Sequence, residues 1–432
     1  MRFTFGSALG RSQRSQAIID DVAREHLEEW QLLFDGSYGK TGNDYPADVN
    51  FSGWGSSYSG GSIPQEQMVE WVEETAARVR SAVVPKARVL ELGCGTGLLL
   101  FRLAPDAVSY VATDFSPVVL DQLGKSLAGQ PWAERVRLLQ REASDFTSFG
   151  DGAFDVVVLN SVVQYFPDRS YLEHVLEQAV RVLAPGGVVV VGDVRHRGLL
   201  SAFHASVQAY QGAGTVGELA RRIRRRVGEE PELVIDPAFF TDLADRWDRV
   251  DHVRVLPKRG RFANEMVKFR YEAFLHVESE TEPLPIPAWT DWADGSLTLD
   301  GLAGRLAGGP GEPFGVTGVP NARVEADVRL RDLALSGEAP ADTQVTGTGL
   351  LVERPVPTGG GEGAVDPEAL CRLAEESGHQ AQLSWAAGDG SGRFDVAFLP
   401  PGAGVGPGTA ISFPSGSGGG TNEPLRSRGE MF

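Results

Sequence analysis

The chain has little cysteine and histidine and no long hydrophobic run. Its 432 residues include two cysteines, Cys94 and Cys371, and seven scattered histidines. These numbers exclude a disulfide framework and a structural zinc site, and we expect no metal centre. No stretch approaches the roughly 20 apolar residues of a membrane span, and the N-terminus lacks the apolar core of a signal peptide. We therefore expect a soluble protein of the reducing cytoplasm, with no membrane partner.

Basic residues are also scarce. The 58 acidic and 40 basic side chains give a formal net charge of -18 at pH 7. Such a chain repels phosphate backbones and anionic membranes unless a local basic patch overrides the overall charge, so nucleic acid is not an expected partner. The one concentrated basic run is RRIRRR at 221–226, a pattern typical of a solvated helix face.

The chain does contain enough apolar residues, 42% of the total, for two or three hydrophobic cores. Glycine is unevenly distributed, because 28 of the 53 glycines follow residue 280. The prolines and charges of 278–287 cannot continue a helix or a central strand and predict a linker. We therefore predict a helical, substrate-side segment over 1–80, a core domain over 81–278 and a small α+β subdomain with a glycine-rich tail over 279–432.

The front of the chain alternates apolar β-type runs with helical patterns. Expected strands cover 88–91, 109–113, 136–140, 154–159 and 188–193. Expected helices cover 12–34, 64–80, 96–103, 117–127 and 171–183, the last ended by Pro-Gly-Gly at 185–187. Continuous Val/Leu runs are typical of strands buried on both faces, so the alternation predicts a doubly wound, mostly parallel α/β sheet. Two more runs, 252–260 and 268–277, are expected to form an antiparallel pair at one edge.

The back of the chain shows weaker patterns. Segments 318–330 and 392–400 are predicted strands. DPEALCRLAEESG predicts a helix with Asp366 as N-cap, Pro367 in the first turn and Gly378 beyond the end. The glycine-rich segments 357–363 and 415–424 are typical of flexible loops or tails.

A glycine-rich turn, ELGCGTG at 91–97, follows the first expected strand. Such a turn lets the backbone approach a ligand closely, and ligands bind at such strand ends. A dinucleotide fingerprint would place its third glycine where Leu98 stands, which disfavours NAD. A nucleoside without a pyrophosphate fits better, because the carboxylate of Asp114, at the end of the second strand, can accept hydrogen bonds from both ribose hydroxyls.

Polar segments also follow the third and fourth strands. ASDF at 143–146 offers Asp145 to an adenine amino group and Phe146 to its ring face, and LNSVVQYF at 159–166 follows the fourth strand. A single Asp at a strand end is usually a turn former or a helix cap. Four such segments in register predict a nucleoside site instead.

In these segments, the chain resembles the class I S-adenosylmethionine methyltransferases and, within them, the methyltransferase domains of nonribosomal peptide synthetases. The resemblance is carried by GWGSSYSGGSIP at 53–64, VLELGCGTGLLLFRLAP at 89–105, ATDFS at 112–116, VVLNSVVQYFP at 157–167, GDVR at 192–195, IDPAFF at 235–240, KRGRFANE at 258–265 and FRYEAFLHV at 269–277. It extends more weakly into the back of the chain. It implies a Rossmann-like fold and S-adenosylmethionine as cofactor. The cofactor-binding residues that we predict are Trp54, Ser57, Glu91, Gly93, Cys94, Gly95, Thr96, Gly97, Asp114, Phe115, Ser116, Ala143, Ser144, Asp145, Phe146, Asn160, Ser161, Val162, Gln164 and Tyr165.

In that family the domain usually interrupts an adenylation domain and methylates the backbone amine of an aminoacyl thioester on a carrier protein. The resemblance therefore implies transfer of a methyl group to the backbone amine of an aminoacyl or peptidyl substrate, with a peptidyl carrier protein as partner. No adenylation motif flanks the domain, so we expect a freestanding enzyme that acts in trans. Two alternatives stay open: methylation of carbon or oxygen on a free or carrier-bound intermediate, and a non-catalytic cofactor-binding partner of a synthetase.

Methyl transfer from a sulfonium is an in-line displacement, so alignment of donor and acceptor supplies much of the rate acceleration. An α-amine with a pKa of about 7.7 to 8.0 needs only a weak base. The predicted catalytic residues are Glu265, Tyr58, Arg195, His204 and Asn264, with Gln164, Tyr165 and Asp193 as further candidates for orienting the acceptor. Glu265 is the first choice, because a carboxylate can both bind an ammonium and accept its proton.

These assignments have structural alternatives. A histidine in the position of His204, within a helical pattern, is more often packed than catalytic, and Asp193 and Arg195 could pair at a strand end. The resemblance also gives the basic run at 221–226 a second use, since carrier proteins are acidic and carry a phosphate on their arm.

Overall fold

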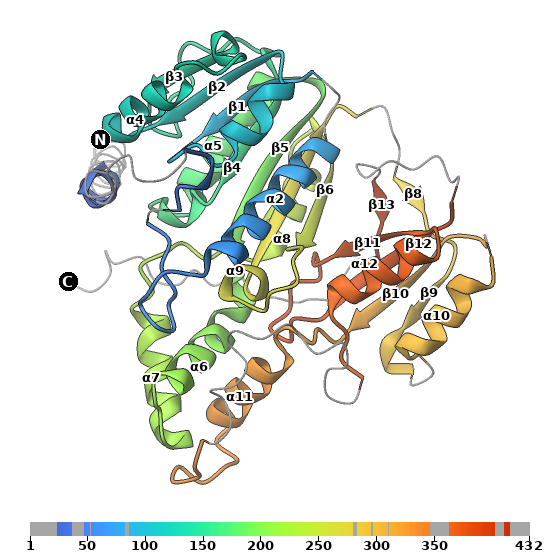
Figure 1. The fold of residues 1–432 in the computed structure, drawn as a ribbon. Helices are drawn as coiled ribbons and strands as arrows, with labels where there is room; N and C mark the ends of the chain where they lie inside the picture. Colours follow the sequence, from blue (N-terminus) through green and yellow to red (C-terminus); the bar gives the residue numbers. More distant parts are fainter. Residues whose placement is uncertain are drawn as a thin grey trace, which may run out of the picture.

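The computed structural model describes residues 24–36, 47–51, 53–82, 86–279, 283–294, 297–309, 311–345, 363–401 and 410–414. The first part of the chain forms a seven-stranded sheet in the order β3-β2-β1-β4-β5-β7-β6 (Figure 1). Its strands are β1 Arg88–Leu92, β2 Ser109–Asp114, β3 Val136–Gln140, β4 Phe154–Asn160, β5 Leu183–Arg195, β6 Val250–Pro257 and β7 Arg270–Val277. The five strands expected from the sequence are all present.

Strands β1 to β5 run parallel, with Val89 opposite Tyr110 on one side and opposite Val156 on the other. β7 pairs antiparallel with both β5 and β6. The predicted doubly wound sheet with an antiparallel edge pair is therefore confirmed. The carboxyl ends of β1, β2, β4 and β5 meet at one edge of the sheet, as they must in parallel strands.

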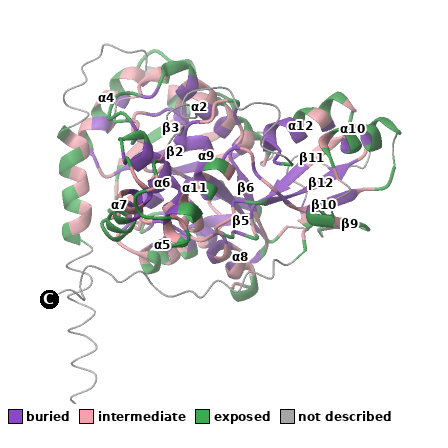
Figure 2. Cartoon of the chain, turned by 90° about the horizontal axis from the view of Figure 1, so that it is seen from below, coloured by how far each residue is buried: buried purple, intermediate pink, exposed green. Residues whose placement is uncertain are grey.

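Helices cover both faces of this sheet, and its strands are largely buried (Figure 2). One hydrophobic cluster packs side chains of α2 (Gln65–Ser81) such as Trp71 against Val156 and Phe274, and another packs side chains of α5 (Arg169–Val182) such as Leu176 against Val157. A helix also covers 24–36. The remaining front helices are α2 Gln65–Ser81, α3 Leu100–Leu103, α4 Pro117–Leu127, α5 Arg169–Val182, α6 Leu200–Tyr210, α7 Val216–Gly228, α8 Pro237–Arg246 and α9 Glu265–Lys268.

Several helices begin at the capping residues that their sequences suggest. Ser116 accepts a hydrogen bond from the Val119 N–H ahead of Pro117, and Asp168 accepts one from the Tyr171 N–H. Each such bond satisfies an N–H that the first turn of a helix leaves unpaired.

Two local predictions were wrong. The helix expected over 96–103 begins at Leu100, because Gly93, Gly95 and Gly97 take positive φ and keep the chain in a wider turn. Pro-Gly-Gly at 185–187 does not end the helix before it, although the sequence predicted this. α5 ends at Val182, and β5 starts at the next residue and includes all three, with an irregular register against β4 at this point.

The back of the chain forms a second, four-stranded sheet in the order β11-β12-β10-β9. Hydrophobic residues in this sheet, such as Phe394, and next to it, such as Trp385, belong to the same cluster as those beneath the large sheet. The strands are β9 Trp289–Asp291, β10 Phe314–Val319, β11 Gln380–Ser384 and β12 Phe394–Leu399, with a separate short pair, β8 Leu284–Pro285 and β13 Ile411–Ser412. The helices are α10 Leu299–Ala307, α11 Glu325–Leu335 and α12 Pro367–Glu376.

In the back unit, the predicted strand over 392–400 is present as β12, and the predicted helix is α12, with Asp366 as its N-cap and Gly378 at positive φ after its end. The predicted strand over 318–330 was wrong: residues 318–319 end β10, 320–324 form a turn, and 325–330 belong to α11. Val324 and Val328, four residues apart, both face the core as one side of a helix does, and their even spacing also imitated a strand.

The helix expected over 12–34 is described from residue 24, and the one over 64–80 is α2. Segment 415–424 and nearly all of 357–363 lie outside the described residues. Among the described helices, none has both the length and the apolar composition that a membrane span requires.

Candidate active site

A first cavity lies at the carboxyl ends of β1, β2 and β4. It is lined by Leu27, Trp30, Phe34, Gly53, Trp54, Trp71, Glu91, Gly93, Cys94, Gly95, Thr96, Leu98, Leu99, Asp114, Phe115, Arg141, Glu142, Ala143, Asn160, Ser161, Val162, Tyr165, Phe166 and Tyr171. The segments that follow β1, β2, β3 and β4 thus converge as the sequence predicted, and the segment after β3 contributes Arg141, Glu142 and Ala143. In the described part of the chain, no group of three His, Cys, Asp or Glu could hold a metal ion.

The glycine turn forms one wall of this cavity. Gly93 has a φ of 71°, and a Cβ there would lie 2.5 Å from Cγ2 of Val162. The N–H groups of Gly93 and Cys94 donate to the Thr113 carbonyl, which fixes the turn against β2. A side chain at Gly93 would be strained and would collide with the opposite wall, so the turn needs glycine to bring bare backbone to a ligand.

Asp114 ends β2 inside this cavity and is almost fully buried. Its two carboxylate oxygens accept hydrogen bonds from the N–H groups of Gly95 and Ser116, both at 2.9 Å. Burial raises the pKa of Asp114 to about 6 against the lowering effect of these bonds. Each oxygen keeps a lone pair for a further donor.

Glu91 is a second buried carboxylate in the same cavity, and the Tyr110 hydroxyl donates to it at 2.8 Å. Burial raises the pKa of Glu91 to about 8; the bond from Tyr110 lowers it and the charge of Asp114 raises it further. Among the described residues, neither Glu91 nor Asp114 forms an ion pair. The cavity is therefore electrostatically suited to a ligand that carries positive charge.

The helix over 24–36 covers the first cavity. Trp30 lies 4.6 Å from Tyr165, and Phe34 lies 5.0 Å from the same ring, measured between ring centroids. His26 contributes a ring nitrogen 3.2 Å from the Tyr165 carbonyl oxygen. The sequence predicted a helix here but did not single out Leu27, Trp30 or Phe34, because their spacing resembles that of an ordinary packed helix face.

The structure does not bring Asp145 and Phe146 into the cavity. The Asp145 carboxylate accepts hydrogen bonds from the side chain and the N–H of Thr147, which lower its pKa, and Phe146 packs in the core against Phe149. Ala143 and the preceding Glu142 line the wall instead. The tight turn after β3 directs the Asp145 side chain toward its own loop, as Asp commonly does in turns.

Five other predicted cofactor residues also lie outside this lining. Gly97 packs under α4, where a Cβ would lie 2.5 Å from Leu123, and Ser116 caps that helix. The Ser144 hydroxyl accepts a hydrogen bond from the Tyr171 hydroxyl. Gln164 is buried, and its backbone carbonyl accepts from the Leu233 N–H. The fifth residue, Ser57, lines a second cavity instead.

The second cavity lies beside α6, α7 and α9. It is lined by Ser57, Arg195, Phe203, His204, Val207, Gln208, Gln211, Arg226, Glu229, Glu230, Pro231, Glu232, Glu265, Phe269 and Arg270. Glu265 is the first residue of α9 and is largely buried. The Ser57 N–H donates to one carboxylate oxygen of Glu265 at 2.9 Å, and the Ser57 hydroxyl donates to the other at 2.8 Å. Segment 53–62, which also contributes Trp54 to the first cavity, thus holds the carboxylate of Glu265.

Arg195 and His204, both predicted from the sequence, converge on Glu230 in this cavity. The Arg195 guanidinium donates to Glu230 at 2.6 Å and to Glu232 at 2.9 Å, and His204 Nε2 lies 3.0 Å from Glu230. Burial alone would raise the pKa of Glu230, but the contact with His204 and the charge of Arg195 outweigh it and lower the pKa to about 2. The sequence missed Glu230 and Glu232, because they lie in a loop after α7 with no motif around them.

Tyr58 and Asn264 are both engaged in contacts that hold the fold together. The buried Tyr58 hydroxyl donates to Ser206 Oγ, and burial raises the pKa of this tyrosine. Asn264 is the N-cap of α9, where its side-chain oxygen accepts from two N–H groups and its amide donates to Gln67. Neither lines the second cavity.

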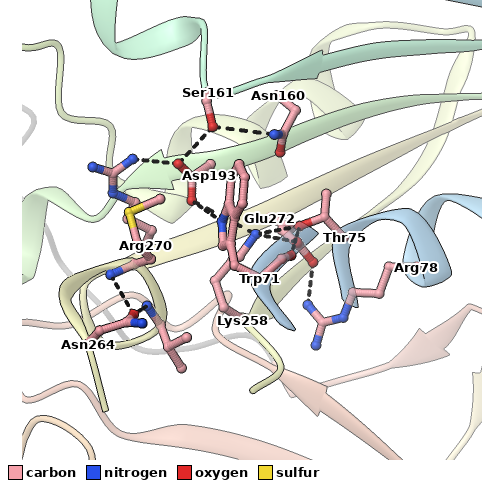
Figure 3. A network of polar contacts seen from close by, with 12 residues as sticks. Trp71, Thr75, Arg78, Asn160, Ser161, Asp193, Lys258, Asn264, Arg270 and Glu272 are labelled. Atoms are coloured by element: carbon pink, nitrogen blue, oxygen red, sulfur yellow. Dashed lines mark hydrogen bonds and ion pairs between the residues drawn. The ribbon is translucent and has the colours of Figure 1, made fainter. Parts of the chain in front are cut away.

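Asp193 links the two cavities (Figure 3). It is completely buried at a φ of 65° and does not pair with Arg195. Instead it accepts hydrogen bonds from Trp71 Nε1 at 3.1 Å and from the Ser161 hydroxyl at 2.9 Å, both in the first cavity, and from Arg270 in the second. A non-glycine residue at positive φ costs free energy that its surroundings must supply, and such strain is concentrated at functional sites.

A buried ionic group supports this link from the sheet (Figure 3). Lys258 Nζ donates to Glu272 at 2.8 Å and to the Thr75 hydroxyl at 3.0 Å, and Arg78 also binds Glu272. Burial would raise the pKa of Glu272, but Lys258 and Arg78 lower it. These side chains belong to α2, β7 and the segment after β6, so they fix the elements around both cavities.

Comparisons with known proteins agree with this geometry. Residues 90–189 match the model of a methyltransferase domain family. The chain is 42% identical over 384 residues to chondramide synthase cmdD from Chondromyces crocatus. The aligned region covers 87% of this chain and 10% of that protein. It is 39% identical over 315 residues to CymA from Salinispora arenicola, a probable non-canonical nonribosomal peptide synthetase, which covers 71% of this chain and 4% of that protein.

The chain thus spans a tenth or less of the length of these two relatives. Among solved structures, it is similar to the CcbJ methyltransferase from Streptomyces caelestis over 30% of this chain and 54% of that chain, with 26% identity and a TM-score of 0.27. The family match lies on the glycine turn and the strands that form the first cavity. The chain therefore contains a methyltransferase domain over residues 90–189 and is similar to a segment of nonribosomal peptide synthetases.

Proposed function

We propose that this methyltransferase transfers a methyl group to the backbone amine of an aminoacyl or peptidyl substrate that is bound as a thioester to a carrier protein. The observation that carries the proposal is the Glu265 carboxylate, which Ser57 holds in the second cavity beside the first. An amine acceptor needs a group that binds its ammonium form and takes its proton. Glu265 can do both.

S-adenosylmethionine, when bound, supplies a methyl group on a sulfonium that leaves as a neutral thioether. We assign it to the first cavity, whose bare glycine backbone and buried carboxylates fit a cationic nucleoside. Asp114 would accept hydrogen bonds from the ribose hydroxyls, and Glu91 would face a positively charged group. The aromatic rings of Phe115 and Tyr165 would take the ring-face contacts that the sequence assigned to Phe146.

The second cavity provides the remaining acceptor functions. Arg270 keeps donors beyond those it uses on Asp193, because a guanidinium has five N–H groups, and one of them can bind the acceptor carbonyl. The compensated cluster of Arg195, His204 and Glu230 forms the opposite wall. We infer that it fixes the shape of the cavity and leaves the proton transfer to Glu265.

The carrier protein is supported by the synthetase relatives and by one surface. α7 carries RRIRRR at 221–226, in which Arg222 pairs with Glu218 and Arg225 with Glu229, while Arg221, Arg224 and Arg226 are exposed. Arg226 also lines the second cavity, so the basic helix face adjoins the site where the acceptor would enter. This is where we expect an acidic carrier to contact the enzyme. The cytoplasmic location stays a prediction from the sequence.

Replacing Glu265 with Gln tests the proposed base. The amide keeps an acceptor oxygen for Ser57 but loses charge and basicity. General bases contribute about 10² to 10⁴-fold, and an amine that is already partly neutral near pH 7 should lie at or below the lower end of that range. We expect slower methyl transfer to an aminoacyl carrier at pH 7, recovery as the pH rises to about 9, and unchanged cofactor affinity.

The matched variant Ser57→Ala removes one of the two hydrogen bonds to Glu265 and should give a smaller loss of the same kind. Equal rates for Glu265→Gln and the parent from about pH 6 to about pH 9 would eliminate Glu265 as the base. Loss of cofactor binding in Glu265→Gln would make the residue structural.

A further inference from the structure

The helix that carries Glu265 is too short to hold its own position. α9 has four residues, Glu265–Lys268, whereas isolated helices shorter than about 12 to 15 residues are marginal in water. The orientation of the Glu265 backbone must therefore come from contacts at the two ends of the segment that contains it, residues 258–268. Two of these contacts come from one short stretch of the back unit, residues 323–327.

The first contact is a clamp on the beginning of the segment. Arg323, whose side chain is 1% exposed, donates to the carbonyls of Lys258 at 2.6 Å and of Gly260 at 2.8 Å. Its third donor, Nε, binds Asp366 at 2.8 Å. The planar guanidinium thus fixes two backbone carbonyls of the segment, two residues apart, at once, which a lysine could not do.

The second contact is an ion pair at the other end. Lys268 Nζ, at the last position of α9, lies 2.5 Å from Asp327 Oδ2, and both side chains are nearly inaccessible to solvent. Arg323 lies in the turn just before α11 and Asp327 in the first turn of that helix, so one stretch of the back unit contacts both ends of the segment, with Glu265 between them. α11 also packs against α6, which carries His204 (Figure 1).

Buried ion pairs are an expensive way to obtain packing, because apolar residues of similar volume often stabilise a fold as well or better. What charged pairs provide is a defined geometry. A misplacement of about 1 Å near reacting groups can cost about 10²-fold in rate. We propose that Arg323 and Asp327 are positioning residues for methyl transfer: the back unit holds α9 at both ends so that Glu265 faces the acceptor amine.

This inference rests on the proposed role of Glu265, and its test separates the two. Asp327→Asn keeps the shape of the side chain but removes the charge that holds Lys268. We expect a lower turnover number with unchanged cofactor affinity, and a loss that does not exceed that of Glu265→Gln. The control is Glu325→Gln on the same helix, which breaks a surface pair with Arg329 and should leave the rate unchanged.

The decisive measurement is the double variant Glu265→Gln/Asp327→Asn. If Asp327 acts through Glu265, the double variant is no slower than Glu265→Gln alone, since residues that act as a unit are not additive. The loss in Asp327→Asn should also shrink toward about pH 9, where the free amine no longer needs a base. A purely structural defect would show neither behaviour.

Several outcomes would overturn the inference. An Asp327→Asn variant with the parental rate would overturn it, and so would losses that multiply in the double variant. In either case, a slow Glu265→Gln variant would still support the proposed function. If Glu265→Gln itself were fully active, the proposed base would fail first. If Asp327→Asn did not fold or bind cofactor, Arg323→Lys gives the same reading: a partial loss that disappears in the Glu265→Gln background supports the clamp, and any other result contradicts it.

Discussion

The two cavities differ in how they treat charge. The first holds two buried carboxylates, Glu91 and Asp114, whose pKa values burial raises to about 8 and about 6. The second holds carboxylates that arginines and a histidine already compensate, so that the pKa of Glu230 is lowered to about 2. In the first cavity, a bound cationic ligand would supply the positive charge that the two carboxylates lack. In the second cavity, the charges of Glu230 and Glu232 are balanced before any ligand binds. Glu265, which Ser57 binds through an N–H and a hydroxyl, keeps a carboxylate available for a substrate amine.

The largest effect that this comparison predicts is on stability, in the second cavity. Arg195→Met removes the cation shared by Glu230 and Glu232, and breaking a buried pair on one side typically costs about 3 to 5 kcal/mol. Denaturant unfolding measures the change. The surface pair Arg246–Glu173 supplies the control, since Arg246→Met should cost less than about 1 kcal/mol. Equal small losses in both variants would show that the cluster is not compensated as described.

The next effect concerns cofactor affinity in the first cavity. Asp114→Ala removes two expected bonds to the ribose, and at about 1.5 to 3 kcal/mol for a hydrogen bond to a charged group the affinity should fall at least tenfold by calorimetry. In the parent, affinity should also fall as the pH drops below about 6, because protonation removes the charge of Asp114.

Asp145→Ala is the matched control for this prediction. It truncates the carboxylate that the sequence assigned to adenine and that the structure directs to Thr147. We expect its cofactor affinity to stay close to that of the parent. An Asp145→Ala variant that bound as weakly as Asp114→Ala would contradict the lining described for the first cavity.

The smallest expected effect is the release of part of a proton from Glu91 when the cofactor binds. With a pKa of about 8, Glu91 is mostly protonated near pH 7 in the empty cavity, and a cationic ligand favours its charged form. Cofactor binding should therefore release a fraction of a proton, measured by calorimetry in buffers of different ionisation enthalpy. Glu91→Gln should abolish the release. If the parent released no proton, the idea that the carboxylates of the first cavity lack a cationic partner would be wrong.

The same contrast explains what the sequence could predict. The first cavity is made of short segments that directly follow strands, so Gly93, Asp114 and Asn160 could be placed from the strand pattern, because parallel strands end at one edge. Asp145 was misplaced because a turn of a few residues decides where its side chain points. The cover over the cavity, Trp30 and Phe34, comes from a distant helix whose pattern gives no sign of a ligand.

The second cavity joins residues from distant parts of the chain, such as Ser57, Arg195, Glu230 and Glu265. Arg195, His204 and Glu265 were identified, the first two as residues of uncertain role. Glu230 and Glu232 were not, because no local pattern marks a loop glutamate that pairs with an arginine on a strand. α11 was taken for a strand because Val324, Ala326 and Val328 alternate with polar residues, and its tertiary contacts decided the matter.

The proposed acceptor is the backbone amine of a carrier-bound aminoacyl group. The most direct test incubates the protein and S-adenosylmethionine with a panel of aminoacyl-loaded carrier proteins, and locates any added methyl group by fragmentation mass spectrometry. We expect one methyl group on the α-nitrogen, formed more slowly by Glu265→Gln at pH 7. A methyl group on carbon or oxygen, or no transfer to any loaded carrier while cofactor still binds, would contradict it.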